Sequence, residues 1–260
     1  MKIVIPGGSG YVGTVLARAF HKQGDEVVVL SRTPANKPWR VVAWDGETLG
    51  EWVAEFEGVD AVINLAGQSV NCRYTGENRR IITESRLKST KVVGEAIAQT
   101  WTPPRVRLQA STATIYAHRY DSPNDEATGI IGGAEPDAPD TWRFSIDVAT
   151  SWERALKDSP TPNTRRVAMR TAIVMHPESG SPFDIILRLV RLGLGGQAGD
   201  GRQYLSWIHQ TDFINAILWL IEHERFAWPG ESRCAQSVNQ CRVHASVAIG
   251  MGRAVWIAGN

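Results

Sequence analysis

Short apolar runs alternate with amphipathic segments along most of this chain. The runs are rich in Val, Ile and Leu and hold few polar residues. Strands that are buried on both faces of a parallel sheet have this pattern. It predicts six strands, at residues 2–5, 26–32, 40–46, 59–68, 105–112 and 164–175.

Between the apolar runs, hydrophobic residues recur at the spacing of a helix. In residues 11–24, Val12 and Val15 begin an apolar face, and Gly24 stands where a helix would stop. A longer helix with one apolar stripe is predicted over residues 77–101. Strands and helices therefore alternate along this part of the chain.

In the last third of the chain, the sequence pattern predicts a further small group of helices and a strand. A helix opened by Pro182, a strand containing Trp207 and a helix over residues 210–224 follow one another there. The alternation of strands and helices indicates an α/β fold of Rossmann type, a doubly wound parallel sheet that binds ligands at the carboxyl ends of its strands. We expect this domain over residues 1–175 and a small C-terminal substrate lobe over residues 176–260.

Composition and charge narrow the classes of partner. Hydrophobic residues make up 43% of the chain, and 28 basic against 27 acidic residues leave a net charge of +1. This balance indicates neither nucleic acid nor a membrane surface as a partner. The first apolar run is too short for a signal peptide, and the later ones are too short for a membrane span. Three cysteines without metal-ligand spacing, Cys72, Cys234 and Cys241, favour a cytoplasmic protein without a metal site or disulfide scaffold.

The stretch "IPGGSGYVG" places a glycine-rich loop between the first strand and the first helix. In a dinucleotide fingerprint, Gly7 allows the sharp turn, Gly10 lets the backbone approach a pyrophosphate, and Gly13 lets the helix pack closely. The N–H groups of Tyr11 and Val12 at the helix start are then expected to bind the phosphates. A glycine-rich turn without a ligand is the alternative.

The end of the second predicted strand indicates which dinucleotide binds. An NAD site usually has an acidic residue there for the ribose hydroxyls, whereas this chain has Ser31 and Arg32. A guanidinium can pair with a 2′-phosphate, so the sequence predicts NADP(H). The alternative is that Arg32 is an ordinary surface arginine. Further coenzyme contacts are predicted at Asp45, Leu65, Ala66 and Gly67.

Several motifs, in their order along the chain, resemble those of a known family. "GGSGYVG", "NLAG", "STATIY", "PNDE" and "SWIHQTDF" are similar to motifs of extended short-chain dehydrogenases/reductases. "NRRIITESRLKST" and "RLGLGGQAGDGRQYLSWIH" resemble, more narrowly, the YfcH-like sugar-nucleotide epimerase branch. The resemblance covers about residues 1–228 and implies a Rossmann-type fold, NADP and a substrate cleft between two lobes. Residues 232–260 do not follow the family's usual continuation by a strand and a helical extension.

The catalytic pair of the wider superfamily, Tyr-x-x-x-Lys, does not occur in this chain. There the tyrosine exchanges a proton with the substrate, and the lysine holds the nicotinamide ribose and lowers the tyrosine pKa. Alignment on Glu153 puts Ser145 and Ala149 at the two places. Neither side chain can do this chemistry.

Three other residues are candidates for the chemistry. By the resemblance, Thr112 lies where the superfamily has its catalytic Ser or Thr, although a strand-end hydroxyl can equally bond backbone. Tyr116 follows as a candidate proton donor or, equally, as a half-buried aromatic side chain. His209 is a candidate acid or base, and a structural, hydrogen-bonded histidine is the favoured alternative.

The positive charges of the long helix raise the question of an anionic substrate. Arg79 and Arg86 are expected on one helix face and could meet such a substrate, but a solvated charged face is the favoured interpretation. Two functions remain. The first is an NADP(H)-dependent oxidoreductase or isomerase acting on a small molecule, and the second is a non-catalytic NADP(H)-binding sensor. A homodimer is compatible with the sequence.

Overall fold

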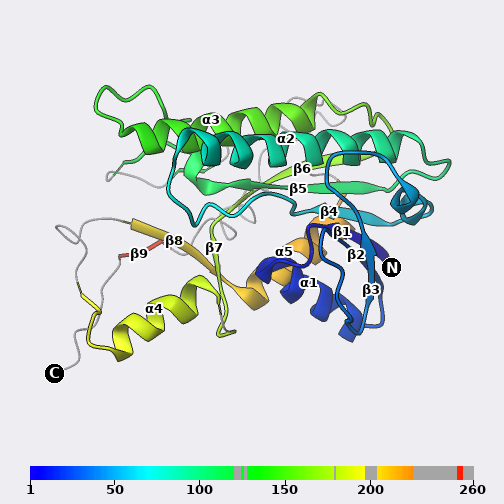
Figure 1. Ribbon diagram of the computed structural model, residues 1–260, viewed down its shortest axis with the longest axis horizontal. Coiled ribbons are helices and arrows are strands. Elements are labelled where there is room, and N and C mark those ends of the chain that lie inside the picture. The colour runs from blue at the N-terminus through cyan, green and yellow to red at the C-terminus, as the bar shows by residue number, and fades with distance from the viewer. Residues whose placement is uncertain (120–123, 126–127, 179, 197–203, 225–250, 254–260) are drawn as a thin grey trace.

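A parallel six-stranded sheet forms the centre of the molecule, with strand order β3-β2-β1-β4-β5-β6 (Figure 1). The computed structural model describes residues 1–119, 124–125, 128–178, 180–196, 204–224 and 251–253. The order reverses between β1 and β4, so the expected Rossmann-type α/β fold is confirmed. The strands are β1 (Lys2–Pro6), β2 (Glu26–Ser31), β3 (Arg40–Ala43), β4 (Ala61–Asn64), β5 (Val106–Thr112) and β6 (Arg165–Thr171).

Helices cover both faces of this sheet (Figure 1). α2 and α3 lie side by side on one face, and α1 and α5 lie on the other. The helices are α1 (Tyr11–Lys22), α2 (Gly76–Ala98), α3 (Asp140–Lys157), α4 (Pro182–Arg191) and α5 (Gln210–Glu222), with 3-10 turns η1 (Glu51–Phe56) and η2 (Ala113–Ile115).

Alternate residues of each central strand enter two separate hydrophobic cores. On β1, Ile3 and Ile5 pack in the core beneath α1, whereas Val4 packs in the core beneath α2. Because both faces are covered, β1, β2 and β4 are apolar at most positions, which explains their continuous apolar runs. Burial on both faces also fixes their register, since a shift of one residue would exchange the two sets of side chains.

The segment after β6 departs from the prediction. Residues 164–175 were expected to form one strand, but the strand ends at Thr171 and β7 (Ile173–Met175) joins a second sheet. There β7 pairs in parallel with β8 (Tyr204–His209), which pairs with β9 (Met251–Arg253). The single-strand prediction is wrong because Ala172 separates two runs that pair with different neighbours.

The last helix belongs to the core of the central sheet. α5 packs against α1, and four of its side chains are buried in the core beneath α1. By contrast, α4 has no buried residue and lies with β8 at one end of the molecule (Figure 1). A domain boundary at residue 175 stays a prediction. The buried residues of α5 are Phe213, Ile217, Leu220 and Ile221.

Part of the C-terminal prediction falls outside the described residues. This is true of Cys234, Cys241 and most of residues 232–260. Within the described residues, no helix combines the length and the apolar composition that crossing a bilayer requires.

Beneath α2 and α3, β5 carries a buried cation. Arg107 is fully buried and donates to the carbonyl of Thr90, to Ser159 Oγ and to Gln109 Oε1. All of these acceptors are neutral, and Arg107 Nε has no acceptor among the described residues. Desolvation, with repulsion from Arg166, lowers the pKa of Arg107 to about 9. A buried cation without a carboxylate therefore reduces the stability of the fold at neutral pH.

The pH dependence of stability tests this buried charge. Between the folded pKa and the higher unfolded pKa, the unfolded chain binds more protons, so stability rises with pH. From pH 8.5 to pH 10, we expect the Arg107 contribution to the free energy of unfolding to rise by about 1 kcal/mol. Arg107→Met should remove this increment in urea denaturation, while Arg154→Met, at an exposed position of α3, should keep it. An unchanged pH slope in Arg107→Met would contradict the assignment.

Candidate functional site

Close backbone contacts shape the loop between β1 and α1. Gly7 has a φ of +74°, and a Cβ atom on it would lie 2.6 Å from the Cα of Ala66. A Cβ atom on Gly13 would lie 2.4 Å from the Cα of Gly8. At Gly10, by contrast, the nearest atom to such a Cβ is 3.7 Å away. Gly7 and Gly13 are thus required by the fold, whereas a side chain at Gly10 would make only an ordinary contact.

Helix α1 starts at this uncrowded position. Gly10 is the N-cap, and its carbonyl accepts from the N–H of Thr14 at 2.9 Å. No side chain among the described residues caps the helix, and its first turn has no acidic residue. The N–H groups of Tyr11 and Val12 precede the first intrahelical donor, so they are available to an anion that the helix dipole also favours.

A second loop, after β4, lies against the first. The N–H of Leu65 donates to the carbonyl of Pro6 at 2.9 Å, and that of Ala66 donates to Asn64 Oδ1 at 3.1 Å. Ala66 is the residue that Gly7 approaches. The structure therefore brings predicted coenzyme residues of both loops together at the carboxyl edge of β1 and β4.

Arg86 of α2 supports the β4 loop from behind. Its guanidinium donates to the carbonyls of Gln68 at 3.1 Å and Ile82 at 2.9 Å, and it lies 5.1 Å from the ring centre of Trp152. A Cβ atom on Gly67 would lie 3.2 Å from this side chain. Burial lowers the pKa of Arg86. Arg86 is therefore not part of a solvated charged face, the interpretation that the sequence favoured. It stabilises the loop after β4 through its hydrogen bond to Gln68.

At the end of β2, Ser31 and Arg32 differ in burial. Ser31 is buried, and its Oγ accepts from the N–H of Thr33 at 3.2 Å. Arg32 is exposed and donates to Gln68 Oε1 over 3.5 Å. Since Gln68 belongs to the loop that Arg86 supports, the Arg32 guanidinium lies at the same edge as the glycine loop. Its single long hydrogen bond leaves most of its donors for a ligand.

Asp45 is engaged within its own loop. Its carboxylate accepts from the N–H groups of Glu47 and Thr48 at 2.8 and 2.9 Å, and from the Thr48 hydroxyl. Desolvation raises the pKa of Asp45, but these hydrogen bonds outweigh it and lower the pKa overall. Asp45 therefore orders the turn after β3, and its contact with adenine stays a prediction.

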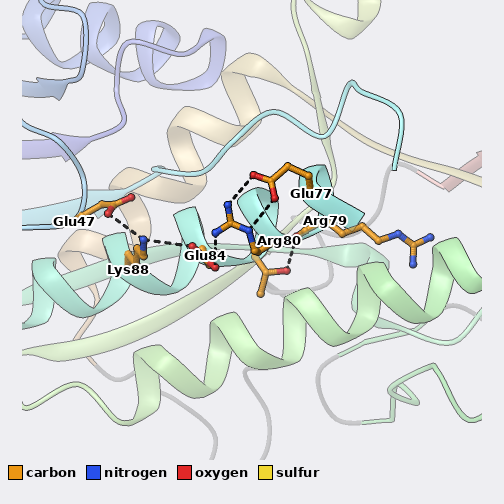
Figure 2. Close-up of polar contacts among 7 residues, drawn as sticks. Glu47, Glu77, Arg79, Arg80, Glu84 and Lys88 are labelled. Carbon is orange, nitrogen blue, oxygen red and sulfur yellow. Dashed lines mark hydrogen bonds and ion pairs between the residues drawn. The ribbon is translucent and has the colours of Figure 1, made fainter. Parts of the chain in front are cut away.

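Most charges along α2 are balanced by neighbouring carboxylates. Arg80 lies between Glu77 and Glu84, and Lys88 reaches Glu84 and Glu47 (Figure 2). Such exposed pairs contribute little to stability. They also leave this face with little unbalanced positive charge for an anionic substrate.

In Figure 2, Arg79 points away from these ion pairs. It pairs with Asp140 of α3. It also lies 4.9 Å from the ring centre of Phe144 and donates to the carbonyl of Tyr74. The hydrogen bond from Arg79 lowers the pKa of Asp140. Arg79 thus joins α2 to α3. Because Asp140 balances its charge, Arg79 does not offer an unpaired cation to a substrate.

Thr112 ends β5 and caps the turn η2. Its Oγ1 accepts from the N–H of Thr114 at 3.2 Å and shares a hydrogen bond of 3.0 Å with the Thr114 hydroxyl. This is the local role weighed as its alternative. Thr112 nevertheless lies at the carboxyl edge of the sheet, on the strand next to β4.

Tyr116 belongs to a network that joins β5, β6 and α3. Arg170 Nη1 donates to the Tyr116 hydroxyl at 2.8 Å, and its guanidinium lies 5.0 Å from the ring centre. Buried Glu153 holds Arg170 through two hydrogen bonds of 2.8 and 2.9 Å and accepts from Ser111 Oγ at 2.7 Å. The bonds with Glu153 raise the pKa of Arg170. This cation stabilises negative charge on the Tyr116 oxygen, and it also fixes the ring.

His209 has a structural role at the start of α5. Its Nδ1 accepts from the N–H of Thr211 at 3.2 Å, which caps the helix. Among the described residues, His209 forms no hydrogen bond with Thr112 or Tyr116. A catalytic role of His209 stays a prediction.

The places of the missing Tyr and Lys lie on α3. Ser145 donates to the carbonyl of Thr141, and Ala149 is fully buried. Sequence reasoning missed two residues near the edge of the sheet, Arg170 and His176. For Arg170, a charged residue near the carboxyl end of a strand, where ligands bind in such a sheet, was an available signal.

Among the described residues, no group of three or more His, Cys, Asp or Glu side chains gathers as a metal site would require. The candidate site described so far consists of backbone amides at the start of α1, the glycine loop and the guanidinium groups of Arg32 and Arg86. They suit a dinucleotide with a diphosphate.

Comparisons with known proteins point to one family. Residues 3–136, just over half of the chain, match the profile of the NAD dependent epimerase/dehydratase family. The human epimerase family protein SDR39U1 is 29% identical over 226 residues, which cover 85% of this chain and 71% of that protein. The epimerase family protein SAR0825 of Staphylococcus aureus (strain MRSA252) is 29% identical over 231 residues, covering 87% and 72%.

Solved structures of epimerase-family proteins have the same fold as this chain. The crystal structure of human SDR39U1 (isoform2) with NADPH superposes with a TM-score of 0.73 at 28% identity, covering 87% of this chain and 72% of that one. UDP-glucuronic acid 4-epimerase from Bacillus cereus, in complex with a fluorinated UDP-glucuronic acid and NAD, gives 0.70 at 18% identity, covering 89% and 76%. The second likeness shows the fold alone.

A pair of glycine substitutions tests the geometry of the loop. Gly13→Ala places a methyl group against the backbone of Gly8, so we expect a loss of about 1–3 kcal/mol in the free energy of unfolding. Gly10→Ala adds only an ordinary contact, 3.7 Å from the carbonyl oxygen of Gly7, and should cost less than about 1 kcal/mol. Urea denaturation measures both, and equal costs at the two positions would contradict the close approach.

Proposed function

Because the chain belongs to the NAD dependent epimerase/dehydratase family, we propose that it binds NADP(H) at the carboxyl edge of β1, β2 and β4. The observation that carries this proposal is the uncapped start of α1 beside the open position at Gly10. The backbone amides of Tyr11 and Val12 would hold the diphosphate there. The coenzyme would cross both loops, which contact each other at Gly7 and Ala66.

The preference for the phosphorylated coenzyme rests on charge. β2 ends in Ser31 and Arg32, without a carboxylate that would accept from the ribose hydroxyls and repel a 2′-phosphate. Arg32 is exposed and lies beside the loop after β4. The related human protein, 28% identical, has a crystal structure with NADPH, which supports the same choice here.

The proposed activity is that of an atypical short-chain dehydrogenase/reductase, an oxidoreductase or isomerase acting on a small molecule. The nicotinamide would supply or accept a hydride. Thr112 would orient a substrate oxygen from the end of β5. Tyr116 would give or take the proton, because Arg170 donates to its oxygen and stabilises the charge that develops there. Holding the substrate beside the coenzyme accounts for much of the rate acceleration in such a site.

One observation favours a second candidate, a non-catalytic NADP(H) sensor. The two places of the superfamily's proton-relay pair hold Ser145 and Ala149, and Ala149 is buried in the core. In this case coenzyme binding would order the glycine loop and the loop after β4 without turnover.

Coenzyme preference tests the assignment of Arg32. We expect the protein to bind NADPH more tightly than NADH, and Arg32→Ala to weaken NADPH binding by about 10-fold while leaving NADH unchanged. Nicotinamide fluorescence gives both dissociation constants. Arg40→Ala is the matched control, since Arg40 pairs with Glu55 at the opposite end of the strands. Equal affinities for the two coenzymes would contradict the role of Arg32.

Turnover separates the two candidate functions. Bound NADPH is offered a panel of aldehydes, ketones and quinones while the absorbance of the reduced nicotinamide is followed. We expect oxidation with at least one class, slowed about 10-fold or more by Thr112→Val, because a positioned hydroxyl would be lost. Thr114→Val removes the neighbouring hydroxyl of the same turn as a control. NADPH binding without oxidation by any class would favour the sensor.

A further inference from the structure

A buried histidine with an unused donor lies beside the first turn of α1. His176 follows β7 and is 2% exposed. Its ring stacks on that of Tyr11, with centroids 5.3 Å apart and an angle of 21° between the planes. Tyr11 is the first residue of α1, so the imidazole is next to the helix start assigned to the diphosphate.

The hydrogen bond at one ring nitrogen fixes the proton on the other. The N–H of Glu178 donates to His176 Nδ1 at 3.3 Å, so Nδ1 is the acceptor and Nε2 carries the hydrogen. Nε2 is buried and has no acceptor in the part of the chain that the structure describes. Leaving a buried N–H without a partner is costly, and such groups call for an explanation.

The surrounding contacts hold this imidazole in place. Ser181 is fully buried, donates to the carbonyl of His176 at 2.7 Å and caps α4 by accepting from the N–H of Asp184 at 3.0 Å. Glu178 pairs with Arg18 of α1. The turn that carries His176 is therefore tied to α1 through an ion pair as well as through the ring contact with Tyr11, and the unused donor has a fixed place.

We propose that His176 Nε2–H donates a hydrogen bond to a diphosphate oxygen of the bound coenzyme, an inference that rests on the proposed function. The backbone N–H of Tyr11 and the imidazole beside its ring then serve the same anion from two sides. Because Nε2 is buried, the Tyr11 ring, which is 38% exposed and forms a hydrogen bond with the Val174 backbone, has to turn for a coenzyme oxygen to reach the imidazole. In the free protein, the unpaired N–H donor lowers the stability of the fold. In the complex, the same donor is hydrogen-bonded, which raises the affinity for the coenzyme.

Two substitutions separate the two ring nitrogens. In His176→Asn, the side-chain oxygen takes the place of Nδ1 and accepts from Glu178, but nothing replaces the Nε2 donor. In His176→Gln, the longer amide places an N–H near Nε2. We expect His176→Asn to raise the dissociation constant for NADPH about 10-fold, and His176→Gln to stay within about 3-fold of the wild type.

Adenosine 2′-monophosphate provides the ligand control, because it has the 2′-phosphate and the adenosine but no diphosphate. Its affinity should be unchanged in both variants, and the melting temperature of ligand-free His176→Asn should equal or exceed that of the wild type. Wild-type affinity of His176→Asn for NADPH would overturn the inference. So would an equal loss of both ligands, which would assign the effect to a damaged loop. If the wild-type protein itself fails to bind NADPH, the proposed function fails and this inference with it.

Discussion

The close approach of two loops at the carboxyl edge of β1 and β4 is the constraint on which the site depends. Gly7 takes a left-handed conformation with no room for a side chain beside Ala66. Gly13 presses the first turn of α1 against the backbone of Gly8. These contacts hold the start of α1 against the sheet, with its first amides uncapped and Gly10 bare beside them. An anion at this place meets oriented N–H groups without reorganising the backbone.

Two arginines, Arg86 and Arg32, lie near this carboxyl edge of the sheet. Arg86, half-buried between α2 and the β4 loop, donates to the carbonyl of Gln68, and the side chain of Gln68 contacts Arg32 at the end of β2. The Arg86 guanidinium thus shapes the loop, whereas the Arg32 guanidinium is exposed at the same edge. The other cations of α2, which are Arg79, Arg80, Lys88 and Lys91, pair with carboxylates. This separation of roles favours one anionic ligand at the glycine loop over a broad basic surface.

Local pattern predicted the central sheet and the glycine loop, because both are encoded in neighbouring residues. The apolar runs became β1 to β5 with small shifts at their ends, and Gly7 and Gly13 have the turn and the close contact expected of them. α3 was not predicted because no side chain caps its start, and Asp140 is the one acidic residue of its first turn.

Contacts between distant segments could not be read from the sequence. Arg107 and Gln109 alternate with apolar residues on β5, as on a strand with one solvated face, yet α2 and the turn after α3 bury that face. The two-sided burial is a property of the packing. His176 looks like an ordinary loop residue, and its contact with Tyr11 joins segments more than a hundred residues apart.

A crystal structure of this protein with NADPH tests the central claim most directly. The account predicts that the diphosphate lies on the N–H groups of Tyr11 and Val12 and that the 2′-phosphate contacts Arg32. A diphosphate bound away from the start of α1, or an ordered Arg32 directed away from the bound coenzyme, would contradict it.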